Sequence, residues 1–266
     1  DLKEILSRPE CRKSDGSEYN IYRDGLRIYT SIDIDMQRIA EEEMIKNMKR
    51  VQKTFWNVWR NMDPWKYKSD SPTETSLEVR QATLSRLVRE SDRYQALRAQ
   101  YLSNTLAEIS REFDVNFSED DHEVEYMMKE DDNPGFLSKL VSQKMITSSM
   151  ASRFREVIES SYFTTLRTRW DELQTNARKA FNRKVKMTDF TYDNARMEKD
   201  TTMTPLDSIK YHRMFLQTGI LAVDPTTGQI KVWVGGINHK YFQYDHIRTR
   251  RQVGSTFKPF VYATAI

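Results

Sequence analysis

The chain has 266 residues, of which 38% are hydrophobic and 30% are charged, enough for a core in one large domain or two modest ones. Its 8 glycines, 7 prolines and single cysteine exclude collagen, low-complexity sequence, an internal disulfide framework and a cysteine-based zinc site. The 42 basic and 39 acidic residues leave a formal net charge of +3, so nothing in the composition requires nucleic acid as a partner.

Residues 1–34 are interpreted as a linker region that contains one strand. Apolar and polar side chains alternate over residues 26–31, after a turn at Asp24-Gly25, and this alternation predicts a strand. From Asp35 onward, apolar residues recur every three or four positions. That spacing predicts a long amphipathic helix that ends near Asp63-Pro64.

The same spacing predicts a second helical stretch from about Thr73 to Asp114, with a possible break at Ser91-Asp92. A third helix is predicted from Pro134-Gly135 to about Phe181. Residues 35–183 are therefore expected to be mostly helical. Four tryptophans are expected to fill the helical core: Trp56, Trp59, Trp65 and Trp170.

An acidic segment separates the second and third predicted helices. Its carboxylates lack the alternating ligands and the turn glycine of a calcium loop, so a solvated linker is the favoured interpretation. These residues are Glu119, Asp120, Asp121, Glu123 and Glu125. The four histidines are scattered without metal-ligand spacing, and we assign neither a metal nor a cofactor.

The sequence pattern changes again after residue 183. Residues 185–203 alternate around Asp193-Asn194 and predict a hairpin, and a short helix is expected to begin at Pro205. Two apolar strands joined by residues 224–228 form the clearest predicted hairpin of the chain. The predicted fold class is therefore α+β, divided into residues 1–34, 35–183 and 184–266.

A serine and a lysine lie one helical turn apart near the end of the chain. Gly254 permits a sharp turn, and Pro259 is tolerated only in a first helical turn, so a helix is predicted to begin close to Ser255. Free N–H groups at such a helix start stabilise negative charge. Lys258 lies on the same helix face, and a neutral amine there can take a proton from a serine hydroxyl. Without further context, the same pair is a helix cap and a solvated lysine.

The flanking sequence adds that context. RQVGSTFKP, preceded by ILAVDPTTGQIKVWVGG, resembles the start of the β-lactamase-like transpeptidase domain of class A penicillin-binding proteins. GLRIYTSIDIDMQRIAEEE resembles the linker between the glycosyltransferase and transpeptidase domains of that family. The resemblance covers residues 20–45 and 185–266 well, and it implies that the long helices of residues 35–183 are an insertion.

The resemblance implies a role for each residue of the motif. Ser255 matches the acylated nucleophile of a D,D-transpeptidase, and its N–H matches part of the oxyanion hole. Lys258 matches the lysine that assists proton transfer, and Gly254 matches the turn glycine before the serine. The implied partners are peptidoglycan stem peptides, with β-lactams as trapping inhibitors. Arg250 and Arg251 either steer an anionic substrate or form a solvated basic loop.

The resemblance also implies parts outside this chain. The Ser-x-Asn and Lys-Thr-Gly motifs of the family follow the nucleophile, whereas the chain stops at Ile266, so these 266 residues are not expected to acylate by themselves. We interpret the chain as a piece of a bifunctional synthase in the bacterial cell envelope, on the periplasmic face, with the glycosyltransferase and the inner-membrane anchor elsewhere in the protein.

Two other functions fit parts of the sequence. The first is a helical interaction module, in which residues 35–183 bind a cell-wall protein partner. The second is a serine β-lactamase or a penicillin-sensor domain, which shares the Ser-x-x-Lys motif but does not need the linker-like sequence at residues 25–37.

Overall fold

A computed structural model describes residues 2–68, 71 and 75–265. The described residues form two compact units, one of residues 49–216 and one of residues 1–48 together with 217–266. Helices precede two short antiparallel hairpins, so the predicted α+β class is confirmed. The three-part division predicted from the sequence stays a prediction. The two units are defined by how compactly the chain packs, whereas the predicted division is defined by changes in the sequence pattern.

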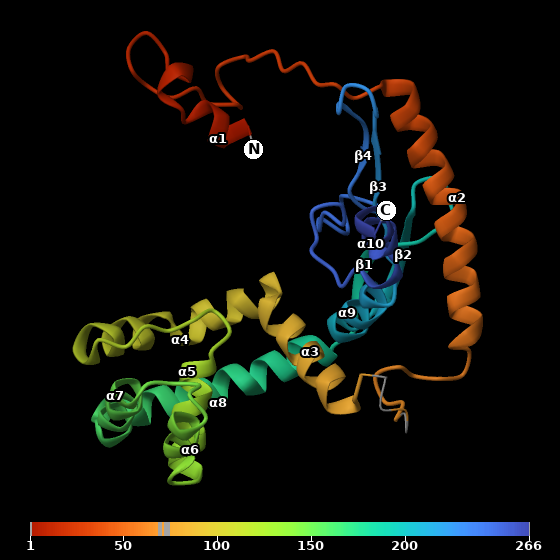
Figure 1. The fold of residues 1–266 in the computed structure, drawn as a ribbon. Coiled ribbons are helices and arrows are strands. Elements are labelled where there is room, and N and C mark those ends of the chain that lie inside the picture. The colour runs from red at the N-terminus through yellow and green to blue at the C-terminus, as the bar shows by residue number, and fades with distance from the viewer. Residues whose placement is uncertain (1, 69–70, 72–74, 266) are drawn as a thin grey trace. The chain divides into compact units, whose positions relative to one another are not determined.

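Figure 1 shows the elements in chain order. The unit of residues 49–216 contains the end of α2 (Ile34–Val58), α3 (Leu77–Glu90), α4 (Asp92–Phe113), α5 (His122–Asp132), α6 (Phe136–Ser142), α7 (Ser148–Glu159), α8 (Ser161–Asn182), β1 (Val185–Phe190), β2 (Glu198–Met203) and α9 (Pro205–Arg213). The other unit contains α1 (Leu2–Leu6), the 3₁₀ helix η1 (Pro9–Cys11), the start of α2, β3 (Ile220–Val223), β4 (Ile230–Val234), the 3₁₀ helix η2 (Gly254–Phe257) and α10 (Lys258–Ala265).

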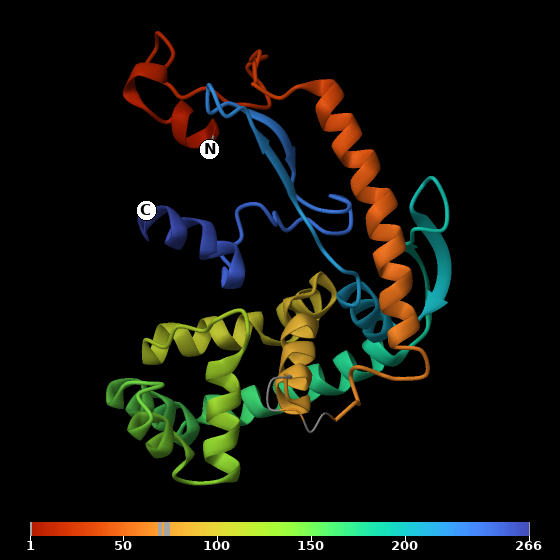
Figure 2. The same ribbon diagram turned by 45° about the vertical axis from the view of Figure 1, so that its right-hand side comes forward.

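The core of the helical unit lies where α4 packs against α8 (Figure 2). Apolar side chains from α4 to α8 that are at most 1% exposed fill this core: Leu102, Ile109, Val124, Met127, Leu137, Ala151, Phe154, Val157, Leu166 and Leu173. Burial of one large apolar side chain stabilises a fold by about 1.5 to 3 kcal/mol. This helical unit therefore has a hydrophobic core of its own.

The predicted break at Ser91 is confirmed. Ser91 is the C-cap of α3 and the N-cap of α4, with extended backbone angles of φ −74° and ψ 143°. Its Oγ accepts a hydrogen bond from the N–H of Tyr94 at 3.4 Å and donates one to the carbonyl of Val88 at 2.6 Å. One hydroxyl thus satisfies backbone groups of two helices. The predicted start of this stretch at Thr73 lies outside the described residues.

The prediction of one continuous third helix is wrong. Residues 134–182, all of them described, form α6, α7 and α8 instead. Thr147 caps α7, because its Oγ1 accepts a hydrogen bond from the N–H of Met150 at 3.1 Å. Ser160 separates α7 from α8 in an extended conformation. Polar caps interrupt the helix here, although the apolar spacing continues through them.

The prediction of a solvated acidic linker is also wrong. Glu123 and Glu125 lie in α5, and Asp121, which precedes this helix, is 0% exposed. The Asp121 carboxylate accepts hydrogen bonds from Arg98 Nε at 2.5 Å and from the Tyr94 hydroxyl at 3.0 Å. A buried carboxylate needs such partners, and α4 supplies both. Between the acidic residues, Val124 and Met127 enter the core.

The predicted first helix is confirmed as α2, although it ends at Val58 and not near residue 63. The predicted strand at residues 26–31 is wrong, because these residues, all of them described, form no strand. The chain there bonds to β4 only at its end. Ser31 Oγ donates to the carbonyl of Ile230 at 2.7 Å, and the N–H of Asp33 donates to the carbonyl of Lys231 at 3.0 Å.

The four tryptophans expected in the helical core are placed differently from one another. Trp65 is 8% exposed, whereas Trp56, Trp59 and Trp170 are half-buried. Trp56 stacks on Tyr211 of α9 with ring centroids 6.3 Å apart. The end of α2 and α9 therefore share an aromatic cluster, which is separate from the α4–α8 core.

Candidate functional site

The β3–β4 hairpin precedes the predicted nucleophile, and its turn is held by Asp224. The carboxylate of Asp224 accepts hydrogen bonds from the N–H groups of Thr226 at 2.9 Å and Thr227 at 3.4 Å. The hydrogen bond from the Thr226 N–H is the main cause that lowers the pKa of Asp224. Gly228 closes the turn at φ +70°, a left-handed conformation that glycine adopts without strain. The predicted hairpin is confirmed.

Gln37 of α2 holds the outer edge of β4. Its Oε1 accepts a hydrogen bond from the N–H of Trp233 at 2.9 Å, and its Nε2 donates to the carbonyl of the same residue at 3.1 Å. The side-chain amide therefore takes the place of a neighbouring strand. Sequence reasoning did not identify this contact, because 196 residues separate the two partners.

We predict that Gln37→Ala will increase the hydrogen-exchange rate of the Trp233 amide about fivefold. The loss of one net hydrogen bond, worth about 1 kcal/mol, corresponds to roughly that factor. Amide exchange followed by NMR measures it. Gln229→Ala is the matched control, because among the described residues its exposed side chain bonds to Lys231 and not to Trp233. An unchanged Trp233 exchange rate in the Gln37 variant would contradict this role.

The loop after β4 is tied to the hairpin by Asp245. The Asp245 carboxylate accepts hydrogen bonds from the indole N–H of Trp233 at 3.2 Å and from the N–H of Ile247 at 2.9 Å. A Cβ at Gly235 would lie 3.1 Å from the same carboxylate, so the close approach favours glycine there. Tyr244 is 64% exposed, and its ring meets that of His246 edge to face, with centroids 5.3 Å apart.

The structure places a helix start at the predicted serine. Gly254 has φ +53°, and Ser255 is the second residue of η2. The N–H of Lys258 donates to the carbonyl of Ser255, so the two residues lie one turn apart. Pro259 is the second residue of α10, where it lacks no needed hydrogen bond. The side chains of Ser255 and Lys258 are both exposed.

The two predicted basic residues differ in their contacts. Arg251 donates to His246 Nδ1 at 2.8 Å, and burial followed by this guanidinium lowers the pKa of His246. Arg250 is exposed and has no acidic partner among the described residues. The sequence did not indicate His246 as a contact of the basic loop.

The chemistry that this segment offers is a hydroxyl at a helix start with an amine one turn later. A cavity of about 430 Å³ lies elsewhere in the same unit, between α2 and the loop after β4, and is lined by Met44, Trp233, Phe242, Tyr244 and Asp245 among others. Ser255 and Lys258 do not line it. The described residues therefore position the Ser-x-x-Lys pair on an exposed turn and do not enclose it.

Comparisons with known proteins agree with the sequence resemblance. Residues 136–216 match the family described as penicillin-binding protein middle domain. The match ends at the last residue of the helical unit. Penicillin-binding protein 1A of Pseudomonas aeruginosa is 39% identical over 51 residues, which are 19% of this chain and 6% of that relative. The match thus spans a small part of the relative's length. No solved structure matches the chain.

These partial matches point to one class of protein. Residues 136–216 are similar to the middle domain of penicillin-binding proteins, and the partial match to the Pseudomonas protein supports a relationship to the same family. Together, the two matches support the interpretation of the chain as a fragment of a class A penicillin-binding protein. None of the helices in the described part is both long and apolar enough to cross a membrane.

Proposed function

We propose that this segment carries the nucleophile of a peptidoglycan D,D-transpeptidase within a bifunctional glycosyltransferase/transpeptidase. The observation that carries the proposal is the turn at Gly254, which begins a helix with Ser255 in its first turn and Lys258 one turn later. This arrangement presents a hydroxyl beside backbone N–H groups and an amine, as acyl transfer requires.

In the proposed reaction, Ser255 Oγ attacks the carbonyl carbon of the penultimate D-Ala of a stem peptide, and neutral Lys258 takes the hydroxyl proton. The N–H of Ser255 stabilises the oxyanion of the tetrahedral intermediate. The bond to the terminal D-Ala then breaks, and that leaving amine receives the proton. The amine of a second stem peptide attacks the resulting ester, which forms the cross-link and restores the serine. A β-lactam undergoes the same attack, and its opened ring stays on the serine.

The exposed Arg250 and Arg251 fit a role in steering the anionic stem peptide toward the serine, although one of them also bonds to His246. The proposed reaction takes place on the periplasmic face, in a protein anchored to the inner membrane. In this proposal, the Ser-x-Asn and Lys-Thr-Gly motifs of the parent protein complete the active site around Ser255.

The test is to label the full-length protein with a fluorescent penicillin, digest it and map the adduct by mass spectrometry. We expect one adduct per molecule, on the peptide that contains Ser255. An adduct on another serine, or no adduct while the stem peptide is still cross-linked, would contradict the proposal.

The match to a penicillin-binding protein middle domain favours a synthase over a β-lactamase or a penicillin sensor. A second function, binding of a cell-wall protein partner by the helical unit, is favoured by a specific cavity among its helices.

A further inference from the structure

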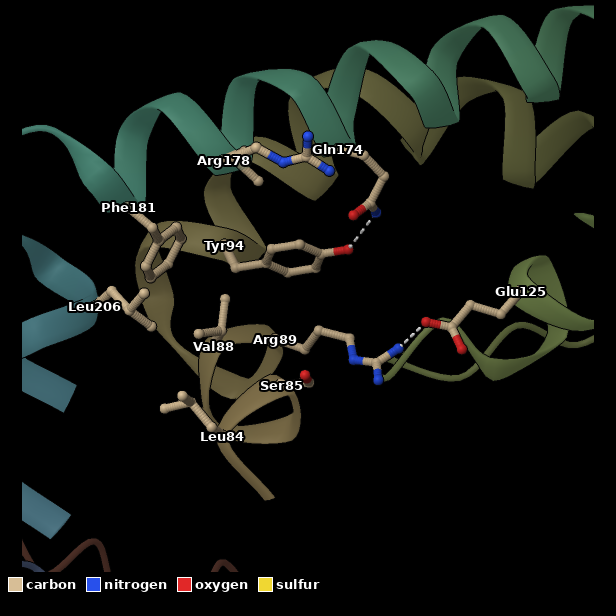
Figure 3. Close-up of a pocket in the computed structure, with 11 residues that line it drawn as sticks. Leu84, Ser85, Val88, Arg89, Tyr94, Glu125, Gln174, Arg178, Phe181 and Leu206 are labelled. Carbon is tan, nitrogen blue, oxygen red and sulfur yellow. Dashed lines mark hydrogen bonds and ion pairs between the residues drawn. The ribbon is translucent and has the colours of Figure 1, made fainter. Parts of the chain in front are cut away.

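A cavity of about 400 Å³ opens within the helical unit, between α3, α4, α5, α8 and α9 (Figure 3). One end of this cavity is apolar. It is lined by side chains from three of the helices: Leu84, Val88, Phe181 and Leu206. Figure 3 shows these four side chains gathered on one side of Tyr94. A cavity of this size and character accommodates an apolar group.

The other end of the cavity is polar, and most of its groups already have partners. The Tyr94 hydroxyl accepts a hydrogen bond from Gln174 Nε2 at 3.4 Å and donates one to Asp121 at 3.0 Å. Arg89 forms an ion pair with Glu125. These groups therefore form a fixed polar wall, and they do not require a ligand for charge balance.

Arg178 differs from the other charged residues that line the cavity, Arg89 and Glu125, which pair with each other. It follows Gln174 by one turn of α8, and its exposed guanidinium has no acidic partner among the described residues. In Figure 3 both side chains extend from α8 on the side where Tyr94 lies. Arg89 and Arg178 against Glu125 leave the lining with one uncompensated positive charge. The cavity thus offers an apolar end and a guanidinium suited to a carboxylate.

We propose that this cavity binds a peptide segment of a partner protein, in which an apolar side chain is adjacent to a carboxylate. The apolar side chain enters the end formed by Leu84 and Phe181, and the carboxylate pairs with Arg178. An exposed guanidinium by itself gives weak binding, so a peptide backbone that lies across the mouth at Ser85 supplies the remaining contacts. The proposal goes beyond transpeptidation and does not depend on Ser255.

The test titrates the ¹⁵N-labelled 266-residue chain with two peptides and follows amide chemical shifts by NMR. The probes are acetyl-Ala-Phe-Glu-Ala-amide and its neutral counterpart acetyl-Ala-Phe-Gln-Ala-amide. We expect shifts at Ser85, Val88 and Arg178, and about threefold to fivefold tighter binding of the peptide with Glu, as an exposed ion pair provides. Absence of shifts at these residues with millimolar peptide would overturn the proposal.

Three variants separate the parts of the site. Arg178→Gln will make the two peptides bind equally, and Ser85→Trp, a change at an exposed position, will block both. Arg111→Gln is the matched control, because Arg111 is an exposed arginine that does not line the cavity. A preference for Glu that survives in Arg178→Gln would overturn the carboxylate assignment. Equal binding of acetyl-phenylalanine amide would show a small-molecule site and overturn the peptide assignment.

Discussion

Replacement of Ser255 by alanine will reduce the rate of penicillin acylation in the full-length protein by at least about a thousandfold. Acyl transfer needs an atom that forms the covalent bond, and removal of a catalytic serine hydroxyl leaves only binding and oxyanion stabilisation. The measurement is the second-order rate of labelling by a fluorescent penicillin, with intact folding checked by circular dichroism.

Thr256→Ala is the matched control for Ser255→Ala. Thr256 carries the neighbouring hydroxyl, which donates to the carbonyl of Val253 within the same turn. Loss of the Thr256 hydroxyl changes the local structure but leaves the proposed nucleophile in place. We therefore expect a labelling rate within about tenfold of the wild type. Equal losses in the two variants would mean that the turn itself, and not the Ser255 hydroxyl, is what the labelling requires.

Replacement of Asp121 by alanine will lower the free energy of unfolding of the helical unit by about 3 kcal/mol. The substitution leaves the guanidinium of Arg98, whose side chain is 16% exposed, without its carboxylate. It also removes the acceptor of the Tyr94 hydroxyl. Urea unfolding followed by far-ultraviolet circular dichroism measures the change.

Asp132→Ala provides the comparison for Asp121→Ala. The carboxylate of Asp132 pairs with Arg167 at 2.6 Å, but its side chain is 62% exposed. Because solvent screens such a pair, we expect a loss of no more than about 1 kcal/mol. Similar losses in both variants would argue against a special contribution from the buried pair.

The pH dependence of the Asp121 contribution has a definite sign. Burial raises the pKa of Asp121 above its ordinary value, and the partner Arg98 opposes this shift. The folded state therefore binds the proton more readily than the unfolded state, and the stability that this group contributes falls as the pH rises. Asp121→Asn lacks the titration, so the wild type's advantage over it should be larger at about pH 4 than at about pH 7.

Local signals in the sequence predicted the elements whose ends depend on nearby residues. Ser91, Asp224 and Gly254 each form the cap or turn that their residue types indicate. The prediction of a solvated linker for the acidic segment was wrong because the partners of Asp121 lie elsewhere in the chain. Arg98 and Asp121 are 23 residues apart, and no local pattern indicates that a helix will bring a cation to a carboxylate.

The candidate site shows the same limit. The start of the helix at Ser255 follows from Gly254 and Pro259, which restrict the backbone themselves. The contact of Gln37 with β4 joins residues at opposite ends of the chain, and the sequence contains no periodic signal for it. Arg178 lies on the exposed side of a helix, where its residue type alone is typical of a solvated surface.

Ser91 connects α3 and α4 in the helical unit through a single residue. Because this one residue both ends α3 and begins α4, the angle between the two helices is carried by a single pair of backbone torsions. Leu84 and Arg89 line the cavity from α3, and Tyr94 lines it from α4. The ψ angle of Ser91 therefore helps to set the distance between the cavity walls that α3 and α4 supply.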